Sequence, residues 1–489
     1  MEQAKYSAAE CAGWCSNVWI NSDTNFPVRG ISHDTRTLKP GDVYIAIKGA
    51  THDGHDFVQQ AVEKGAAGII VAREFPMFAS RLRGQASDAG TIPQMVVFDT
   101  MAALWALAAG VRSHWTGTVI GITGSVGKTT VKELIASVLS QKGTVCKTPG
   151  NWNNDIGLPL SMLAADRNAD FFVFELGMNH PGEIDSLASL LEPDWAVITD
   201  IGKAHIEFFQ SLEGIAEEKA ALLAYADNAL LDETSEWFEL FRSKCAGRVV
   251  TFGKEPFAFS VPLPGEHMIR NARRAAALGL ALGLSPEAVQ AGLSAFQSAP
   301  MRWERSLHKG IIFINDAYNA NPLSMRAALT TFAQLPCEGR RFAVLGGMRE
   351  LGAQTETEHR ELGQFVNTLK LDGVITIGGL GTQIVCDGMI GIEKSAAVDT
   401  LRTRLRAGDM VLFKASRGER LETILEELKT RIYLPRSFAA KYQELKLCYI
   451  GCLSSVMCFH LCACSAISPS APCWPPEPLL FSVSSSARG

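Results

Sequence analysis

The stretch GITGSVGKTT at residues 121–130 follows an apolar segment and precedes an amphipathic one. In the second segment, apolar residues recur at the spacing of one helix face, at Val131, Leu134, Ile135, Val138 and Leu139. A glycine-rich turn between a strand and a helix lets backbone N–H groups surround phosphate oxygens, and the positive end of the helix points at them. The stretch therefore predicts a phosphate-binding loop.

Within this loop, Lys128 is expected to reach the β- and γ-phosphates of a nucleotide, and Thr129 to ligate Mg²⁺. The full set of expected nucleotide contacts in the loop is Gly124, Ser125, Val126, Gly127, Lys128, Thr129 and Thr130. The strict pattern has Gly or Ala five residues before Gly127, where this chain has Ile122. A Gly-rich turn can also simply connect two elements without binding a ligand. The combination of strand, Gly-Lys-Thr and helix favours nucleotide binding.

Glu175 ends a second apolar segment, which begins at Phe171. A carboxylate at the carboxyl end of a strand beside a phosphate loop is placed to hold Mg²⁺ directly or through water, although many strands end in acids. The chain has no Asn-Lys-x-Asp guanine-reading motif, which disfavours a GTPase. The phosphate loop alone leaves kinase, ligase and ATPase open.

Apolar segments alternate with helical patterns along most of the chain. The expected strands are residues 43–48, 68–72, 95–99, 118–123, 171–176, 195–200, 248–252, 311–315, 341–345, 373–377 and 409–414. This alternation predicts an α/β fold with parallel sheets covered on both faces. A length of 489 residues fits three domains. We expect them at residues 1–99, 100–309 and 310–433, the last a smaller Rossmann-like sheet.

Composition excludes some classes of protein. The chain has 46 Lys and Arg against 51 Asp and Glu, a net charge of −5, which argues against nucleic-acid binding through a basic field. An early acid, Glu2, and no apolar run at the start predict that there is no secretory signal, and hence a cytoplasmic protein. No pair of the 12 cysteines has C-x-x-C spacing, so neither disulfides nor structural zinc are expected.

The tail at residues 434–489 differs from the rest. Residues 447–467 contain no Asp, Glu, Lys or Arg, and 21 residues are long enough to span a bilayer. Ser454, Ser455, His460 and Ser465 make the stretch only moderately apolar. We therefore expect an extension outside the fold, with membrane contact only if the tail acts as an anchor.

Several segments together resemble the Mur ligases. They are residues 123–130 (TGSVGKTT), 150–159 (GNWNNDIGLP), 175–179 (ELGMN), 204–209 (AHIEFF), 316–322 (DAYNANP) and 344–352 (VLGGMRELG). The resemblance runs in chain order over residues 28–433. It is strongest to the members that add D-alanyl-D-alanine to UDP-N-acetylmuramoyl-tripeptide. The Asp-Asn-Pro-Arg tetrapeptide usual in the members that add the third amino acid is absent here.

The resemblance implies one domain for the UDP end, one for ATP, and a third that closes over them with the amine substrate. The implied reaction passes through an acyl phosphate and yields the UDP-N-acetylmuramoyl-pentapeptide precursor of peptidoglycan, with ADP and phosphate. ATP and two Mg²⁺ are the implied cofactors, and we expect a monomer. The alternatives are a Mur-type ligase that adds a single amino acid, a P-loop small-molecule kinase, and a nucleotide-binding scaffold without catalysis.

By the same resemblance, Thr129 and Glu175 serve the first Mg²⁺ and His205 the second. Lys219 aligns with a lysine that several Mur ligases carry as a carbamate, an oxygen ligand for the metal. Taken alone, His205 would be an ordinary half-buried histidine, and Lys219, on a Glu-flanked helix, part of a solvated face.

Substrate contacts are also implied by the resemblance. The other end of the nucleotide is expected to meet Asn271, Arg302, Asp316 and Asn319. The UDP group is expected to meet Ser32, Asp34, Thr35 and Arg36, which otherwise form a polar loop. Lys414, Ser416 and Arg417 are expected to reach the substrates on closure. The tripeptide is expected near Asn151, Asn153 and Asn154, which could instead cap a helix.

The chain departs from the family pattern at four positions. Met301 replaces the usual Gly before Arg302, Met268 the usual Asn after His267, Gly347 the usual Asp after Leu-Gly, and Ala415 the usual Gly after Lys414. These departures bear on nucleotide affinity and on the third domain.

Overall fold

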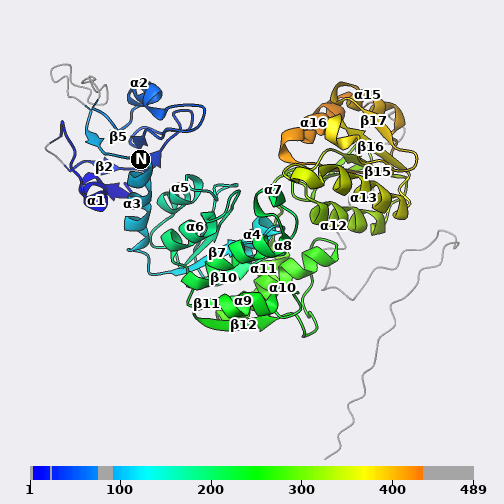
Figure 1. Cartoon of the computed structure of the whole chain (residues 1–489), viewed down its shortest axis with the longest axis horizontal. Helices are drawn as coiled ribbons and strands as arrows, with labels where there is room; N and C mark the ends of the chain where they lie inside the picture. Colours follow the sequence, from blue (N-terminus) through cyan, green and yellow to red (C-terminus); the bar gives the residue numbers. More distant parts are fainter. Residues whose placement is uncertain (1–3, 23–24, 75–91, 433–489) are drawn as a thin grey trace, which may run out of the picture. The chain divides into compact units, whose positions relative to one another are not determined.

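The computed structural model describes residues 4–22, 25–74 and 92–432 (Figure 1). Its contacts divide the chain into two units, Met1–Leu434 and Pro435–Gly489. The second unit, with the uncharged stretch at residues 447–467, lies outside the described residues. Within the described ranges no helix combines the length and the apolar character needed to cross a membrane.

The predicted α/β class is confirmed, with three mainly parallel sheets in the first unit. The amino-terminal part contains a parallel sheet of order β3-β4-β5-β6 and a separate antiparallel pair, β1 with β2. Its strands are β1 (Tyr6–Ser7), β2 (Pro27–Val28), β3 (Ile31–Ser32), β4 (Val43–Ile45), β5 (Gly68–Val71) and β6 (Gln94–Val96). Its helices are α1 (Ala8–Trp14), η1 (Gly54–Phe57), α2 (Val58–Glu63) and α3 (Thr100–Arg112).

The central sheet has six parallel strands in the order β12-β11-β10-β7-β9-β8. They are β7 (Thr118–Thr123), β8 (Val145–Lys147), β9 (Phe171–Glu175), β10 (Trp195–Ile198), β11 (Asn228–Asp232) and β12 (Arg248–Phe252). The accompanying helices are α4 (Lys128–Leu139), α5 (Gly157–Ala164), α6 (Glu183–Leu191), α7 (Ile206–Phe209), α8 (Leu212–Ala220), η2 (Ala221–Tyr225), α9 (Phe238–Lys244), α10 (Glu266–Ala281) and α11 (Pro286–Ala295).

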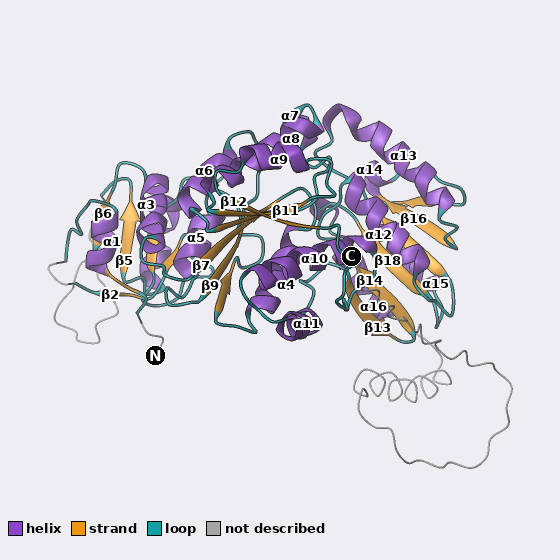
Figure 2. Ribbon diagram, turned by 90° about the horizontal axis from the view of Figure 1, so that it is seen from below, coloured by secondary structure: helices purple, strands orange, loops and turns teal. Residues whose placement is uncertain are grey.

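Both faces of the central sheet are buried, as the apolar strands predict. Figure 2 shows α4, α10 and α11 on one side of the sheet and α6, α8 and α9 on the other. Alternate residues of a strand point to opposite faces. Ile120 and Ile122 of β7 accordingly pack in the same cluster as α4, and Val119 belongs to the cluster of the opposite face. All five residues of the predicted apolar stripe on α4 are fully buried.

The carboxyl-terminal sheet has the order β13-β14-β18-β15-β16-β17, parallel except for β13. Its strands are β13 (Glu304–His308), β14 (Ile311–Asn315), β15 (Arg341–Leu345), β16 (Gly373–Ile377), β17 (Ile390–Ile392) and β18 (Met410–Lys414). Its helices are α12 (Pro322–Gln334), η3 (Gly352–Gln354), α13 (Thr355–Thr368), α14 (Gly378–Gly381), α15 (Lys394–Arg404), η4 (Arg417–Glu419) and α16 (Leu421–Arg431).

All eleven predicted strands correspond to strands in the structure, five of them with identical bounds: β7, β12, β14, β15 and β16. The sequence analysis missed β1, β2, β3, β8, β11, β13 and β17. The predicted domain limits stay predictions. The hairpin of β13 with β14 spans the expected limit at residues 309 and 310, because β13 is already part of the carboxyl-terminal sheet.

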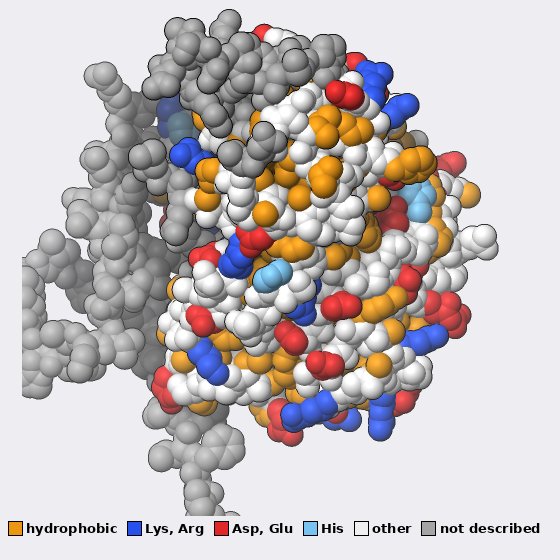
Figure 3. All heavy atoms as spheres, turned by 90° about the vertical axis from the view of Figure 1, so that its left-hand side faces the viewer, with side chains coloured by type: hydrophobic (Ala, Val, Ile, Leu, Met, Phe, Trp, Pro, Cys, Tyr) orange, Lys and Arg blue, Asp and Glu red, His pale blue; other side chains and the backbone are white. Residues whose placement is uncertain are grey.

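Acidic and basic side chains are interspersed on the described part of the face in Figure 3, which agrees with the nearly balanced composition. The six cysteines at Cys11, Cys15, Cys146, Cys245, Cys337 and Cys386 are free thiols.

Candidate active site

The predicted phosphate loop connects β7 to α4 and needs its two glycines. Gly124 and Gly127 have φ values of +145° and +92°, which side chains other than glycine rarely adopt. A Cβ at Gly124 would lie 1.9 Å from Oγ1 of Thr199. Helix α4 begins directly after Gly127. Its first backbone N–H groups have no partner within the helix, and they carry the positive end of the helix dipole into the loop.

Two amides of the loop are already engaged. The N–H groups of Ser125 and Val126 donate to the carbonyl oxygen of Asp200, at 2.9 and 3.1 Å. The hydroxyl of Ser125 is buried and has no hydrogen-bond partner among the described residues. Both residues line the cavity over the loop. The Ser125 hydroxyl is therefore available to a phosphate, and phosphate contacts of the two amides stay predictions.

Lys128 is a half-buried cation with no anionic partner among the described residues. Its ammonium donates to the carbonyl oxygen of Gly124 at 2.8 Å, and no carboxylate of the described residues forms an ion pair with it. Burial lowers the pKa of Lys128 below its usual value, with Arg302 acting in the same direction and Glu175 in the opposite one. A bound anion such as a nucleotide phosphate would compensate this charge.

Glu175 lies against the loop because β9 is the neighbour of β7, with Ile122 opposite Glu175 in the register. Its Oε2 accepts from the Thr129 hydroxyl at 3.0 Å, and its Oε1 accepts from the Asn153 side chain at 2.9 Å. The backbone N–H of Glu175 donates to the Thr148 hydroxyl at 2.8 Å. The carboxylate is 2 % exposed and held in one orientation.

The oxygen atoms of Thr129 and Glu175 suit Mg²⁺. This ion is commonly bound by one or two protein oxygens together with substrate phosphates and water. The two groups lie together at the start of α4, beside the loop that would hold the phosphates. No cluster of three or more His, Cys, Asp or Glu side chains that could hold a metal occurs within the described ranges. The donor set therefore fits a metal whose remaining ligands come from the nucleotide and from water.

Lys219, on α8, is buried rather than solvated, at 1 % exposure. No hydrogen bond or ion pair of its ammonium is found among the described residues. Burial and the nearby charge of Lys128 lower the pKa of Lys219 well below its usual value, although Glu218 and Glu175 oppose them. The solvated-face alternative for this lysine is thereby excluded.

His205 lies away from the loop cavity, which it does not line. Its Nδ1 is 2.7 Å from Oε2 of Glu350, a contact that lowers the pKa of the Glu350 carboxyl. Both residues have positive φ values, +60° and +64°. The predicted metal role of His205 thus stays a prediction.

The residues expected at the other end of the nucleotide gather at the same cavity. Asn271, Arg302, Asp316 and Asn319 all line it, and Lys414 does so as well. The guanidinium of Arg302 lies over the ring of Tyr318, 4.2 Å from its centroid. His267, which the sequence analysis did not assign, also lines the cavity. Burial lowers its pKa.

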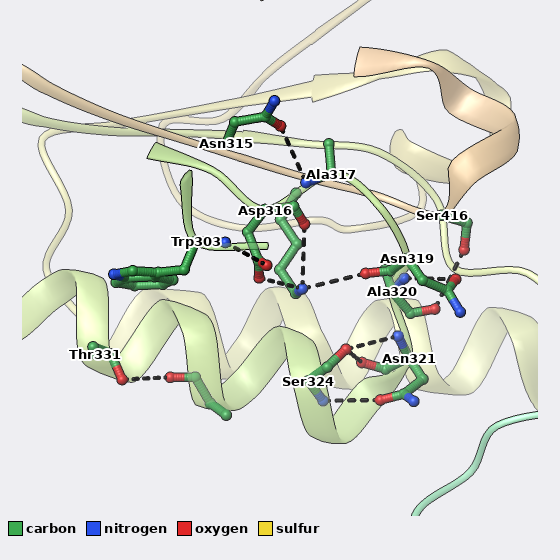
Figure 4. A network of polar contacts seen from close by, with 12 residues as sticks. Trp303, Asn315, Asp316, Ala317, Asn319, Ala320, Asn321, Ser324, Thr331 and Ser416 are labelled. Atoms are coloured by element: carbon green, nitrogen blue, oxygen red, sulfur yellow. Dashed lines mark hydrogen bonds and ion pairs between the residues drawn. The ribbon is translucent and has the colours of Figure 1, made fainter. Parts of the chain in front are cut away.

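Lys414 is engaged with Asp316 and Asn319, the two residues labelled in Figure 4 that accept from its ammonium. Its ammonium is 2.6 Å from Oδ2 of Asp316 and also donates to the carbonyl oxygens of Asp316 and Asn319. The other carboxylate oxygen of Asp316 accepts from the backbone N–H of Trp303 at 3.1 Å. In this structure Lys414 is placed to orient Asp316, and its contact with a substrate stays a prediction.

The other two residues expected to reach the substrates also have protein partners. The hydroxyl of Ser416 donates to the carbonyl oxygen of Ala320 and accepts from the N–H of Arg349. Arg417 forms an ion pair with Glu422 at 2.6 Å. Neither residue lines the loop cavity, so their substrate contacts stay predictions.

The four residues expected at the UDP group form a compact turn after β3. Arg36 donates to both carboxylate oxygens of Asp34, and Ser32 donates to the carbonyl oxygen of Asp34. The Thr35 hydroxyl donates to Gln60 at 2.5 Å and is buried. Arg36, although paired with Asp34, has 86 % of its side chain exposed.

The three asparagines expected near the tripeptide have different surroundings. Asn153 binds Glu175, as described above, whereas Asn154 accepts from the N–H of Gly157 at the start of α5, the capping alternative. Asn151 is exposed. The sequence analysis missed Lys132, which is 1 % exposed and donates to the carbonyl oxygens of Thr148 and Gly150. It secures the loop before the asparagines, and nothing in the helical pattern of α4 marks it.

The departures from the family pattern have local consequences. Met301 has a φ of +58°, a conformation that favours the glycine usual at this position. A Cβ at Gly347 would lie 2.4 Å from Cβ of Leu380, so an aspartate there would require α14 to move. Met268 and Ala415 are buried in apolar clusters.

Comparison with known proteins shows which family the chain belongs to. Three family models match the chain: "Mur ligase family, catalytic domain" at residues 27–112, "Mur ligase middle domain" at 122–258 and "Mur ligase, glutamate ligase domain" at 301–417. The UDP-N-acetylmuramoyl-tripeptide–D-alanyl-D-alanine ligase of Bacillus subtilis is 36 % identical over 436 residues, or 82 % of this chain and 93 % of that protein. The chain belongs to the Mur ligase family.

Further relatives agree. The enzyme of the same name from Escherichia coli is 33 % identical over 437 residues, which cover 82 % of this chain and 93 % of that protein. The crystal structure of MurF from Acinetobacter baumannii superposes with a TM-score of 0.77 at 29 % identity, covering 88 % of this chain and all of the other. MurF ligase from Thermotoga maritima, solved in complex with ADP, gives a TM-score of 0.70 at 29 % identity, covering 82 % and 97 %. As a Mur ligase, the chain is an ATP-dependent enzyme that forms carbon–nitrogen bonds.

Proposed function

We propose that this Mur ligase joins D-alanyl-D-alanine to UDP-N-acetylmuramoyl-tripeptide, coupled to cleavage of ATP to ADP and phosphate. The product is the UDP-N-acetylmuramoyl-pentapeptide used to build peptidoglycan. The observation that carries the proposal is the grouping of Lys128, Thr129 and Glu175 at one sheet edge. The relatives named for this activity support it, because this chain matches more than nine-tenths of the length of each.

The reaction has two steps: the γ-phosphoryl group is transferred to the substrate carboxylate in the first and released as phosphate in the second. The terminal carboxylate of the tripeptide attacks the γ-phosphorus of ATP, the bond from that phosphorus to the β–γ bridging oxygen breaks, and ADP leaves. The amine of D-alanyl-D-alanine then attacks the acyl carbon, phosphate departs, and the amine loses a proton. The first step brings two anions together, so charge compensation and positioning dominate its barrier.

The residues of this chain supply that compensation. The Lys128 ammonium, whose one partner in the described part of the chain is a carbonyl oxygen, is available to the β- and γ-phosphates. The free N–H groups at the start of α4 add the positive end of the helix. Asp316, fixed by Lys414 and the Trp303 N–H, is proposed to accept from the ribose. Arg302 and Asn319 line the same cavity.

Mg²⁺ is proposed as a cofactor, held by Thr129 and Glu175. When bound, it would neutralise phosphate charge and fix the orientation of the γ-phosphate. Asn153 keeps the second oxygen of Glu175 occupied and thereby turns Oε2 toward Thr129. A second ion at His205 is proposed on the family resemblance alone.

Lys219 is proposed to carry a carbamate. A neutral amine adds CO₂ to give an N-carboxylate and a proton, and a lysine with a lowered pKa is neutral more often at a given pH. The absence of any ion pair to Lys219 among the described residues, in spite of its burial, supports this modification. The resulting anion would also offset the charge of Lys128, which is electrostatically coupled to it.

The test is phosphate release from ATP with each substrate omitted in turn. Release that requires both the tripeptide nucleotide and D-alanyl-D-alanine, with one pentapeptide product per phosphate, would establish the ligase. Transfer of phosphate to a stable product would support the kinase, and nucleotide binding without phosphate release under any combination would support the scaffold. Sedimentation of the purified chain would test the monomer, and fractionation of cells the cytoplasmic location.

A further inference from the structure

We propose that Asp200, fixed by Arg274 and Arg270, is a positioning residue of the phosphate loop and controls the affinity for the nucleotide. Asp200 follows β10, whose residue Ile198 lies opposite Thr123 at the end of β7. It therefore stands at the same sheet edge as the loop. The inference rests on the proposed function, because it concerns the same ATP site.

The backbone of Asp200 forms the floor of the loop. Its carbonyl oxygen accepts from the N–H groups of both Ser125 and Val126, and Val126 forms a bridge with Asp200. One oxygen atom thus fixes two consecutive peptide units just before Gly127 and Lys128. A shift of this oxygen would move the loop and, with it, the start of α4.

The side chain of Asp200 is fixed from the opposite side by α10. Its Oδ1 is 2.5 Å from Nη2 of Arg274, and its Oδ2 is 3.1 Å from Nη2 of Arg270. Burial alone would raise the pKa of Asp200, but the two arginines outweigh burial and lower the pKa below its usual value. The carboxylate is therefore ionised at neutral pH, and both contacts are charge-assisted hydrogen bonds.

Helix α10 reaches the loop at a second point. Asn271, next to Arg270, has its amide oxygen 2.9 Å from where a Cβ would stand at Gly127. The helix thus defines the position of Ser125 and Val126 through Asp200, and the space around Gly127 through Asn271. Helix α10 therefore lies close to both ends of the segment from Ser125 to Gly127, at one end through Asp200 and at the other through Asn271.

The Arg274 contact is poorly arranged as a simple stabilising ion pair. Arg274 is 3 % exposed, and its Nε and Nη1 have no hydrogen-bond partner among the described residues. Asp232, the other nearby carboxylate, is 3.7 Å from Nη2. Burial of a cation with unsatisfied donors opposes folding, and replacing such a pair by apolar groups is often neutral or stabilising. This arrangement points to positioning rather than to stability as the role of Arg274.

The experiment measures ADP affinity by titration calorimetry, and the kcat and KM for each substrate by phosphate release. The variants are Arg274→Met, Asp200→Asn, their combination, and Arg274→Lys. Arg273→Met is the matched control, because Arg273 lies next on α10 but donates to the carbonyl oxygens of Gly253 and Glu255 instead. Melting temperatures are recorded for all variants.

Arg274→Met and Asp200→Asn are each expected to weaken ADP binding and raise the KM for ATP roughly tenfold, as for the loss of one charge-assisted contact. The KM for D-alanyl-D-alanine should not change. The double variant should lose little more than either single one, because both remove the same contact. Arg274→Lys should recover most of the affinity, and Arg273→Met should resemble the wild type.

Unchanged nucleotide affinity in both single variants would overturn the inference, as would a fall in melting temperature without a change in the KM for ATP. If Arg274→Met does not fold, the ADP affinity and the KM for ATP of the nearly isosteric Asp200→Asn test the inference. A wild-type chain that binds ADP but ligates nothing would contradict the proposed function and leave the positioning role supported by the ADP titrations. A wild-type chain that binds no ADP would overturn both.

Discussion

The carboxyl edges of the central and the carboxyl-terminal sheets each present a buried lysine, but the two sheets treat its charge differently. At the central edge, Lys128 donates only to a carbonyl oxygen, and Lys219 forms no ion pair among the described residues. At the carboxyl-terminal edge, Lys414 is paired with Asp316 at 2.6 Å and accepted by two further carbonyl oxygens.

The difference separates an edge whose lysine charge is left for a ligand from an edge whose lysine is already paired. Uncompensated buried charge is unfavourable in the free protein and becomes favourable when an anion arrives. The central edge is therefore prepared for phosphates, whereas the carboxyl-terminal edge is satisfied before any ligand binds. We expect substitutions of lysine to affect activity at the first edge and stability at the second.

The largest effect is expected from Lys128→Met. Loss of the only cation in the loop should reduce kcat/KM for ATP by about a thousandfold, the scale of removing one electrostatic contact to a transferring phosphoryl group. Phosphate-release kinetics would measure it. Stability should stay the same or rise, because a half-buried charge with a lowered pKa is removed. A clear fall in stability would contradict the assignment of this edge to binding.

The same variant has a pH signature. The pKa of Lys128 is lower in the folded than in the unfolded chain. Between the folded pKa and about 10.5, the unfolded state binds more protons, so the free energy of unfolding of the wild type should increase as pH rises through this window. Denaturation of the wild type and of Lys128→Met at several pH values should show their difference shrinking toward pH 10.5.

Lys414→Met, in contrast to Lys128→Met, should lower stability. It leaves Asp316 as an unpaired carboxylate, with a side chain 16 % exposed, and should lower the free energy of unfolding by about 3 kcal/mol. Urea denaturation would measure the loss. The double variant Lys414→Met with Asp316→Asn, which leaves no charge behind, should recover part of it. A single variant as stable as the wild type would show that the pair is not the support described here.

Lys219→Ala tests whether the second uncompensated lysine also serves binding. We expect a loss of roughly a hundredfold in kcat, within the range for removing one preorganised electrostatic group, and a partial recovery when short carboxylates are added. Mass spectrometry of the wild type under CO₂ should reveal the adduct. Failure of both the rescue and the adduct would remove the carbamate from the mechanism.

The smallest effect is expected in the segment between α11 and β13, where Met301 and Trp303 both have positive φ values. Met301→Gly relieves the unfavourable left-handed conformation and should stabilise the chain by about 0.5–1 kcal/mol. Ser306→Gly, in the extended strand β13, is the control and should be destabilising. Equal effects at both positions would show that Met301 is not strained.

More of the contacts at the central edge than at the carboxyl-terminal edge could be predicted from the sequence. The loop, α4 and Glu175 are marked by local patterns, and parallel pairing of β7 with β9 then brings Glu175 to Thr129. The partner of Lys414 lies 98 residues away, and no local pattern announces it. Strand β13 was missed because it is an edge strand with no buried residue. The link from Asp200 to the loop runs through a backbone oxygen, which no side-chain motif can encode.

The crowding at Gly347 restricts the order in which this sequence could change. Restoring the aspartate usual in the family would place its Cβ 2.4 Å from that of Leu380, and both are β-carbons on backbone that cannot yield as a side-chain tip would. A change at Leu380, or a movement of α14, would have to come first. The effects of substitutions at the two positions are therefore coupled, and an aspartate at Gly347 is expected to cost more stability alone than together with a change at Leu380.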